Sequence, residues 1–179
     1  MEEKPKSVAM NGITYGIITG VIIILFSLIL YLFDQNLNTA LTWIAYLFLV
    51  GGMIWGTLDY RKKVLNGYMS YGKAFSTSFM IVLFAAILVG IYSYLFYQVI
   101  APDAVQDIID MSRQQALERN PNMSDEELER AMEMGAFFMT PIWMAIYGMI
   151  GQIIIGSIIA LITSLFLKKE DNSMTSSAI

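Results

Sequence analysis

Long apolar stretches separated by polar segments set the pattern of this chain. A bilayer core about 30 Å thick is crossed by about 20 mostly apolar residues in a helix. Four stretches near or above that length contain no acidic or basic side chain, and they cover residues 10–33, 41–58, 75–100 and 137–167. The pattern predicts an all-α protein, a four-helix transmembrane bundle formed by a single membrane domain over residues 1–179.

The first stretch follows a short charged start, as the apolar core of a signal peptide would. The apolar core of a signal peptide is about 7–15 residues long, which is shorter than this stretch. No small-residue cleavage pattern follows Phe33. We therefore expect a retained spanning helix.

The composition supports a membrane location and narrows the chemistry. Of the 179 residues, 56% are hydrophobic and 15% are charged, whereas soluble domains carry roughly a quarter charged residues. The chain has no Cys and no His, which removes disulfides, thiolate nucleophiles, imidazole bases and nearly all zinc sites. We expect a protein without enzymatic activity or cofactor, and we assign no catalytic, cofactor-binding or metal-binding residue.

Basic residues are distributed unevenly between the segments that flank the stretches. Residues 1–9, 59–74 and 168–179 hold eight of the eleven Lys and Arg residues against five acidic ones, a net charge of +3. Residues 34–40 and 101–136 hold three basic and ten acidic residues, a net charge of −7. Because segments rich in Lys and Arg resist translocation, we expect both termini in the cytoplasm and the acidic segment outside.

Small residues at four-residue spacing mark packing faces in two stretches. These faces are formed by Gly12, Gly16 and Gly20 in the first stretch and by Gly156, Ala160 and Ser164 in the fourth, with Gly148 and Gly151 a little earlier. Such patterns let helix backbones approach closely. We favour contacts between helices of one chain over a dimer seam.

Among the polar side chains inside the stretches, we weighed ten hydroxyls and one amide as candidates for contacts. They are Thr14, Thr19, Ser27, Ser76, Thr77, Ser78, Ser93, Gln152, Ser157, Thr163 and Ser164. Ion-coupled pumps usually use a charged residue inside the membrane, so this set counts against a pump. We expect Gln152 to form a hydrogen bond to a Ser or Thr of a neighbouring helix rather than to contact a substrate.

The long polar segment before the fourth stretch predicts two amphipathic helices. Apolar positions at helical spacing indicate a first helix from Asp103 to about Arg119, and Asn120-Pro121-Asn122 interrupts it. Ser124 and Glu127 have the spacing of a capping box, which begins the second helix. We expect the two to pack as an extramembrane helical hairpin over residues 101–136.

Acidic residues share one face of the first of these helices and cluster at the start of the second. They are Asp103, Asp107 and Asp110 in the first, and Asp125, Glu126, Glu127 and Glu129 in the second. Neither group follows the ligand spacing of a calcium loop, and carboxylates at a helix N-terminus favourably meet its dipole. We interpret both groups as solvated or capping residues.

The loop between the second and third stretches carries a basic cluster and a turn signal. Arg61-Lys62-Lys63 is suited to anionic lipid headgroups, and Asn66-Gly67 marks a turn. Gly72-Lys73-Ala74 lacks the hydroxyl residue that a phosphate-binding loop carries after its Lys. Anchoring at the membrane surface explains the loop.

Four segments of the chain resemble the DUF4199 family, and we expect the resemblance to cover nearly the whole chain. They are the run from Asn66 to Phe75, the Pro102-Asp103 start of the acidic segment, the residues from Met132 to Pro141, and the glycine-rich fourth stretch that ends in Lys168-Lys169. The resemblance implies a small protein with four spans in the inner membrane of bacteria of the Bacteroidetes type. The function of the family is unknown, so the resemblance assigns no residue a role.

Three classes of function stay open. The leading hypothesis is a non-enzymatic structural or accessory component whose partners are the lipid bilayer and either another protein or further copies of the chain as a homo-oligomer, with no nucleic acid. The alternative is a small transporter or channel subunit lined by residues 76–78 and Gln152. The third is a membrane enzyme that uses carboxylates near an interface, such as Asp34, Asp59 or the outer acidic group.

Overall fold

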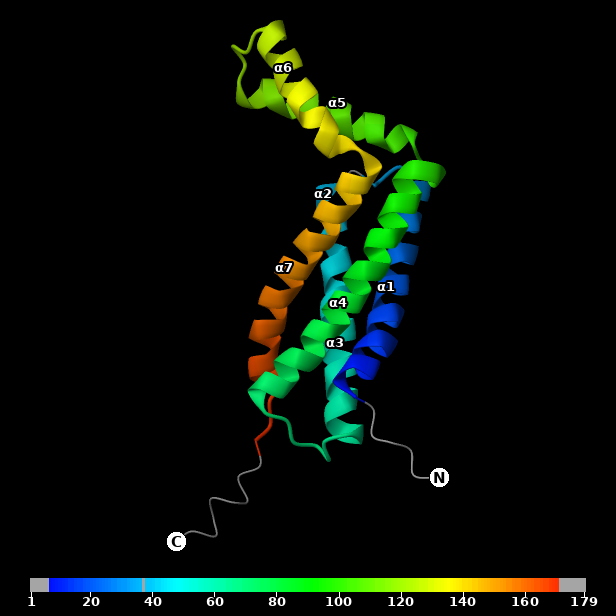
Figure 1. Ribbon diagram of the computed structural model, residues 1–179, viewed down its shortest axis with the longest axis vertical. Helices are drawn as coiled ribbons and strands as arrows, with labels where there is room; N and C mark the ends of the chain where they lie inside the picture. Colours follow the sequence, from blue (N-terminus) through cyan, green and yellow to red (C-terminus); the bar gives the residue numbers. More distant parts are fainter. Residues whose placement is uncertain (1–6, 37, 171–179) are drawn as a thin grey trace. The chain divides into compact units, whose positions relative to one another are not determined.

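The computed structural model describes residues 7–36 and 38–170 of the chain, which are almost entirely helical. The elements in chain order are α1 (Val8–Leu32), α2 (Thr39–Thr42), α3 (Ile44–Lys63), α4 (Tyr71–Leu95), the π-helix η1 (Phe96–Ile100), α5 (Asp103–Arg119), α6 (Asp125–Ala136), the 3-10 helix η2 (Phe137–Met139) and α7 (Pro141–Leu167) (Figure 1). Four segments are long and apolar enough to cross a membrane, namely Val8–Leu32, Ala40–Lys63, Tyr71–Ile100 and Pro141–Leu167. The predicted all-α fold with four candidate spanning helices is confirmed.

Several helices begin or end a few residues away from the apolar stretches. α3 continues to Lys63, whose ammonium forms an ion pair of 2.8 Å with the carboxylate of Asp59 one turn earlier. Basic residues in the last turn of a helix also interact favourably with its dipole. α7 begins at Pro141, because proline is favoured at the first helical position and its fixed φ is already helical.

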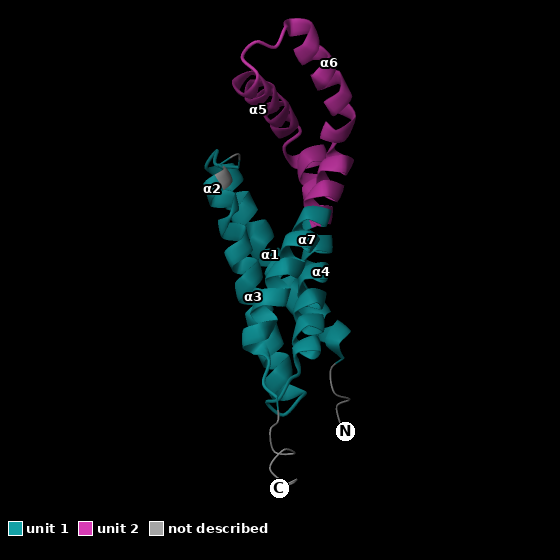
Figure 2. Ribbon diagram, turned by 90° about the vertical axis from the view of Figure 1, so that its left-hand side faces the viewer, with its two compact units in different colours: residues 1–89, 150–179 teal, residues 90–149 magenta. Residues whose placement is uncertain are grey.

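The chain groups into two compact units, which Figure 2 colours separately. Unit 1 comprises residues 1–89 and 150–179, and unit 2 comprises residues 90–149. Unit 1 therefore contains α1, α2, α3 and the larger parts of α4 and α7. The single-domain organisation expected from the sequence stays a prediction.

The glycine face of α1 packs against α4 in unit 1. A Cβ atom added at Gly12, Gly16 or Gly20 would lie 2.5, 2.6 or 3.0 Å from side-chain atoms of Met80, Phe84 or Leu88, respectively. The residue numbers rise together, so α1 and α4 run parallel. The face is used within the chain, as the intramolecular interpretation predicts.

Close packing also joins α3 to α1 and α7 to α4. A Cβ atom added at Gly56 of α3 would lie 2.6 Å from Tyr15, and one at Gly156 of α7 would lie 2.5 Å from Val82. Ala160 and Ser164, which continue the small-residue face of α7, are fully buried. Gly151, by contrast, has nothing within 4 Å of an added Cβ, so it belongs to no such contact. α4 thus lies at the centre of unit 1.

Unit 2 contains the two amphipathic helices predicted from the sequence, α5 and α6. The capping box is formed as expected, since the Ser124 hydroxyl accepts a hydrogen bond from the Glu127 amide and the Glu127 carboxylate accepts one from the Ser124 amide. Leu128 of α6 and Ala104 of α5 are buried. The packing of the two apolar faces as a hairpin stays a prediction.

Candidate functional site

One end of unit 1 gathers basic residues from the end of α3, from the start of α4 and from the residues after α7. α3 ends there, α4 begins there and α7 ends there. We call this the basic end, and among the described residues its basic side chains are Arg61, Lys62, Lys63, Lys73, Lys168 and Lys169. Figure 1 shows the α3–α4 loop and the end of α7 at the same end of the helices.

A backbone bridge fixes the α3–α4 loop to the residues after α7. The Met69 amide donates to the Lys169 carbonyl over 2.7 Å, and the Lys169 amide donates to the Met69 carbonyl over 2.8 Å. The loop reverses at Asn66 and Gly67, whose φ angles of 52° and 91° lie in the left-handed region, as the turn signal predicts. Two segments that carry the family resemblance therefore meet here.

Arg61 adds a side-chain bond to this junction. Its Nη1 donates to the Leu167 carbonyl over 2.7 Å. The last carbonyls of a helix have no partner within the helix, so the guanidinium caps the C-terminus of α7. Beneath the loop, Tyr60, Met69, Ala74 and Leu167 form a buried apolar cluster.

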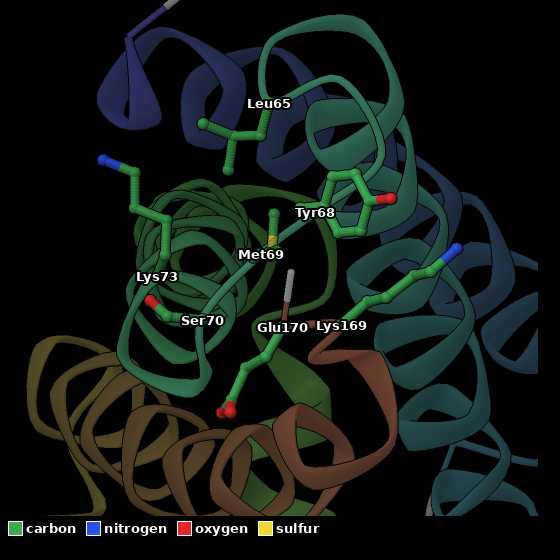
Figure 3. A pocket seen from close by; sticks show the side chains of 7 residues that line it. All are labelled: Leu65, Tyr68, Met69, Ser70, Lys73, Lys169 and Glu170. Carbon is green, nitrogen blue, oxygen red and sulfur yellow. The ribbon is translucent and has the colours of Figure 1, made fainter. Parts of the chain in front are cut away.

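An open hollow lies between the loop and the residues after α7. Its volume is about 410 Å³, and it is lined by Leu65, Tyr68, Met69, Ser70, Lys73, Lys169 and Glu170. We call it the loop hollow. Figure 3 shows Met69 in its middle, with the ammonium groups of Lys73 and Lys169 extending to opposite sides. Leu65 and Met69 contribute apolar side chains to its lining, and Lys73, Lys169 and Glu170 contribute charged ones.

The charges near the loop hollow are only partly neutralised within the described chain. Lys63 pairs with Asp59 at 2.8 Å, and Lys168 lies 3.7 Å from Glu170. In residues 7–36 and 38–170, neither Lys73 nor Lys169 has a carboxylate within ion-pair distance. The Lys169 ammonium lies 5.5 Å from the centre of the Tyr68 ring, within the range of a cation–π interaction.

The hydroxyls that could line a pore are bonded inside unit 1. Ser76 and Thr77 donate to carbonyls one turn earlier in α4, over 2.9 and 2.8 Å. The Ser78 and Thr57 hydroxyls bond to each other across α4 and α3 at 2.9 Å, and both residues are fully buried. Of these three hydroxyls of α4, Ser78 is therefore the one that joins two helices.

The cross-helix bond expected of Gln152 is not formed within the described residues. Gln152 is half-buried one turn before Gly156, which packs against Val82. α4 and α7 run antiparallel, because Tyr71 near the start of α4 bonds to Leu161 near the end of α7. The position opposite Gln152 therefore falls near Ala86, which offers no polar side-chain atom.

Two residues that do form hydrogen bonds between helices, Asn11 and Thr57, were not predicted from the sequence. The Asn11 amide donates to the Gly56 carbonyl over 3.1 Å with its side chain buried, and Thr57 is the partner of Ser78. Both signals were visible, since each is a polar residue inside or at the edge of an apolar stretch. The loop hollow was also overlooked, because its walls come from distant segments.

The carboxylates considered for catalysis do not gather into one centre. Asp34 is exposed with a φ angle of 53°, and Asp59 pairs with Lys63 and also hydrogen-bonds with Tyr15. The acidic groups of α5 and α6 lie in unit 2 and are exposed. Among the described residues, no group of three His, Cys, Asp or Glu side chains could hold a metal ion.

The family model described as "Protein of unknown function (DUF4199)" matches residues 14–169, most of the chain. The protein belongs to the DUF4199 family. No curated protein and no solved structure matches it. The DUF4199 match includes the α3–α4 loop, all of α7 and Lys169, so the bridge and nearly all of the loop hollow lie within the family region.

Proposed function

We propose that this DUF4199 protein is a non-enzymatic accessory component of a bacterial inner membrane, which presents unit 2 to a partner protein on the periplasmic side. The observation that carries the proposal is the closed packing of unit 1. At Gly12, Gly16 and Gly156 even one added carbon would overlap the neighbouring helix. Such packing suits a rigid membrane support, because small residues let backbones reach their closest approach.

Unit 2 supplies the surface that we assign to the partner. The side chains of Met134, Phe137 and Phe138 are 78, 59 and 50% exposed, at the end of α6 and in η2. Large exposed apolar side chains that lie together mark interaction sites more often than chance placement does. Exposed carboxylates of α5 and α6 give the same unit an acidic surface.

Crosslinking in the native bacterium, followed by capture from mild detergent, tests the accessory role. We expect a protein partner to be recovered with the wild-type chain and lost with Met134→Ser/Phe137→Ser. The matched control is Ile154→Ser/Ile158→Ser, which changes two exposed apolar residues of α7 in unit 1. Recovery of the chain alone and monomeric would contradict the proposal.

Cysteine labelling tests the proposed orientation, because the chain has no native Cys. We expect a membrane-impermeant maleimide to label Asn120→Cys from the periplasm and Gly72→Cys after the inner membrane is opened. A Cβ atom at Gly72 has open space around it, and so has one at Gly51 within α3. Gly51→Cys is therefore the control for a lipid-facing position and should stay unlabelled. Labelling of residues 72 and 120 from one side would refute this topology.

The transporter or channel alternative has less support. The hydroxyls of residues 76–78 are used in bonds within the chain, and a pore needs polar groups that face a passage. Proteoliposomes with purified protein should show no flux of ions or small solutes above empty vesicles. Reproducible flux that the Ser78→Leu variant abolishes would favour the alternative.

A further inference from the structure

We propose that the loop hollow is a specific binding site for the headgroup of one anionic phospholipid. The lining combines the apolar side chains of Leu65 and Met69 with two cations, Lys73 and Lys169. Its one carboxylate, Glu170, lies within ion-pair distance of Lys168. This inference rests on the spanning helices alone, so it holds or fails independently of the accessory role.

The position of the hollow suits a lipid headgroup. α3 ends at Lys63 and α4 begins at Tyr71, and both belong to segments able to span a membrane. The loop between them therefore lies at the depth where a bilayer changes from acyl chains to headgroups. A volume of about 410 Å³ is within the range of pockets that hold small ligands, roughly 300–1,000 Å³.

The charges around the hollow select for a negative headgroup. Lys168 and Glu170 lie within ion-pair distance of each other, which leaves the Lys73 and Lys169 ammonium groups without a carboxylate among the described residues. They extend to opposite sides of Met69 (Figure 3). A headgroup over Met69 would lie between the two ammonium groups and be attracted by both charges, while its glycerol contacts the apolar lining. Basic pockets between membrane helices bind anionic headgroups by this combination.

The bridge between Met69 and Lys169 makes this site more than a charged surface. Its two backbone bonds of 2.7 and 2.8 Å fix Lys169 beside the loop. Arg61 donates to the carbonyl of Leu167, two residues before Lys169. The cations therefore sit on a backbone ordered before the lipid arrives, which reduces the entropy lost on binding.

Native mass spectrometry of the full chain in mild detergent tests the site. After delipidation, the protein is mixed with equal amounts of anionic phosphatidylglycerol and zwitterionic phosphatidylcholine. We expect one phosphatidylglycerol to be retained preferentially. The Lys73→Gln/Lys169→Gln variant should bind it roughly 30-fold more weakly, because each Lys near an anionic lipid contributes roughly fivefold in affinity.

Two matched variants separate a site from general surface charge. Arg113→Gln/Arg130→Gln removes the same charge from exposed positions of α5 and α6 that do not line the hollow, and it should bind as the wild type does. Lys73→Arg/Lys169→Arg keeps the charge and should also bind, which shows that the positions tolerate substitution. Equal weakening in both Gln variants, or equal retention of the two lipids by the wild type, would overturn the proposal.

Two further arms test the hollow itself and the source of the phosphate. Ser70→Trp fills the hollow while both lysines remain, so it should abolish selective retention, and undiminished binding would refute the assignment. Glycerol phosphate at millimolar concentration should not displace the lipid. Displacement would show a site for free phosphate esters and would overturn the commitment to a lipid. Circular dichroism checks that each variant keeps the helical content of the wild type.

Discussion

Met69 and Lys169 exchange two backbone hydrogen bonds, one of 2.7 Å and one of 2.8 Å. One residue lies in the loop before α4 and the other lies directly after α7, so the pair joins two spanning helices outside their apolar regions. Isolated bridges of this kind depend on neighbouring contacts, because two hydrogen bonds contribute little net stability against the entropy of ordering a loop.

Arg61 is the neighbour on which we expect this bridge to depend. Arg61→Gln removes the Nη1 donor, which bonds to the Leu167 carbonyl over 2.7 Å. A hydrogen bond from a charged group contributes about 1.5–3 kcal/mol, and partial exposure of Arg61 places this one toward the lower value. We predict faster hydrogen exchange at the Met69 and Lys169 amides. Lys62→Gln, an exposed neighbour without a bond to α7, should leave both rates unchanged.

The contact between Gly16 and α4 predicts a large effect from a single methyl group. A Cβ atom at Gly16 would lie 2.6 Å from the Phe84 Cβ and 2.9 Å from the Ile81 carbonyl oxygen. Because the backbone of α4 must move, Gly16→Ala should lower the free energy of unfolding by about 1–3 kcal/mol.

Gly51→Ala is the control for this effect, since nothing lies within 4 Å of an added Cβ there. Ala is a better helix former than Gly, so we expect this variant to unfold with equal or higher free energy. Unfolding by sodium dodecyl sulfate in mixed micelles, followed by circular dichroism, measures both variants. Equal stability of Gly16→Ala and the wild type would show that α1 does not pack on α4 as described.

Much of the fold was predictable because it depends on local patterns. Four uncharged apolar stretches predict the spanning helices, the spacing of Gly12, Gly16 and Gly20 predicts a packing face, and Ser124 with Glu127 predicts the start of α6. Each pattern is a property of residues close together in the chain. Burial in lipid, close approach of helices and helix capping can each be predicted without knowing which distant residues will be in contact.

The candidate site could not be predicted in the same way. The bridge between Met69 and Lys169 is a backbone contact, and no side-chain pattern encodes which distant backbone groups will pair. Gln152 shows the reverse difficulty. Its polarity suggested a cross-helix bond, but the register of α7 on α4 places it near Ala86. Contacts between distant residues, such as that of Gly156 with Val82, set this register.

The buried hydroxyl pair of Thr57 and Ser78 predicts a measurable coupling. Their oxygens lie 2.9 Å apart between α3 and α4, and both side chains are fully buried. Thr57→Val and Ser78→Ala each remove one member of the pair. Side-chain hydrogen bonds between membrane helices contribute about 0.6 kcal/mol on average in double-mutant cycles, and we expect a coupling free energy of that size from micelle unfolding. Strict additivity of the two substitutions would refute the bond.

The capping box of α6 predicts a dependence of local structure on pH. The Ser124 amide and hydroxyl each donate to Glu127 Oε2 over 2.9 Å, and these bonds hold the pKa of the Glu127 carboxyl below its usual value. A group whose pKa is lower in the folded state stabilises that state above the unfolded-state pKa. The contribution is lost as the pH falls through the folded-state pKa. The start of α6 should therefore fray on acidification.

Nuclear magnetic resonance of the full chain in micelles measures this effect through the backbone carbon shifts of the first turn of α6. In the wild type we expect loss of helical shifts as the Glu127 carboxyl itself becomes protonated. Glu127→Gln should begin with a weaker first turn and show little further change, because an amide does not titrate in this range. Glu133→Gln changes another exposed carboxylate of α6 and should behave as the wild type does. A Glu127→Gln variant that frays over the same pH range as the wild type would assign the effect to other carboxylates and contradict the role of the capping box.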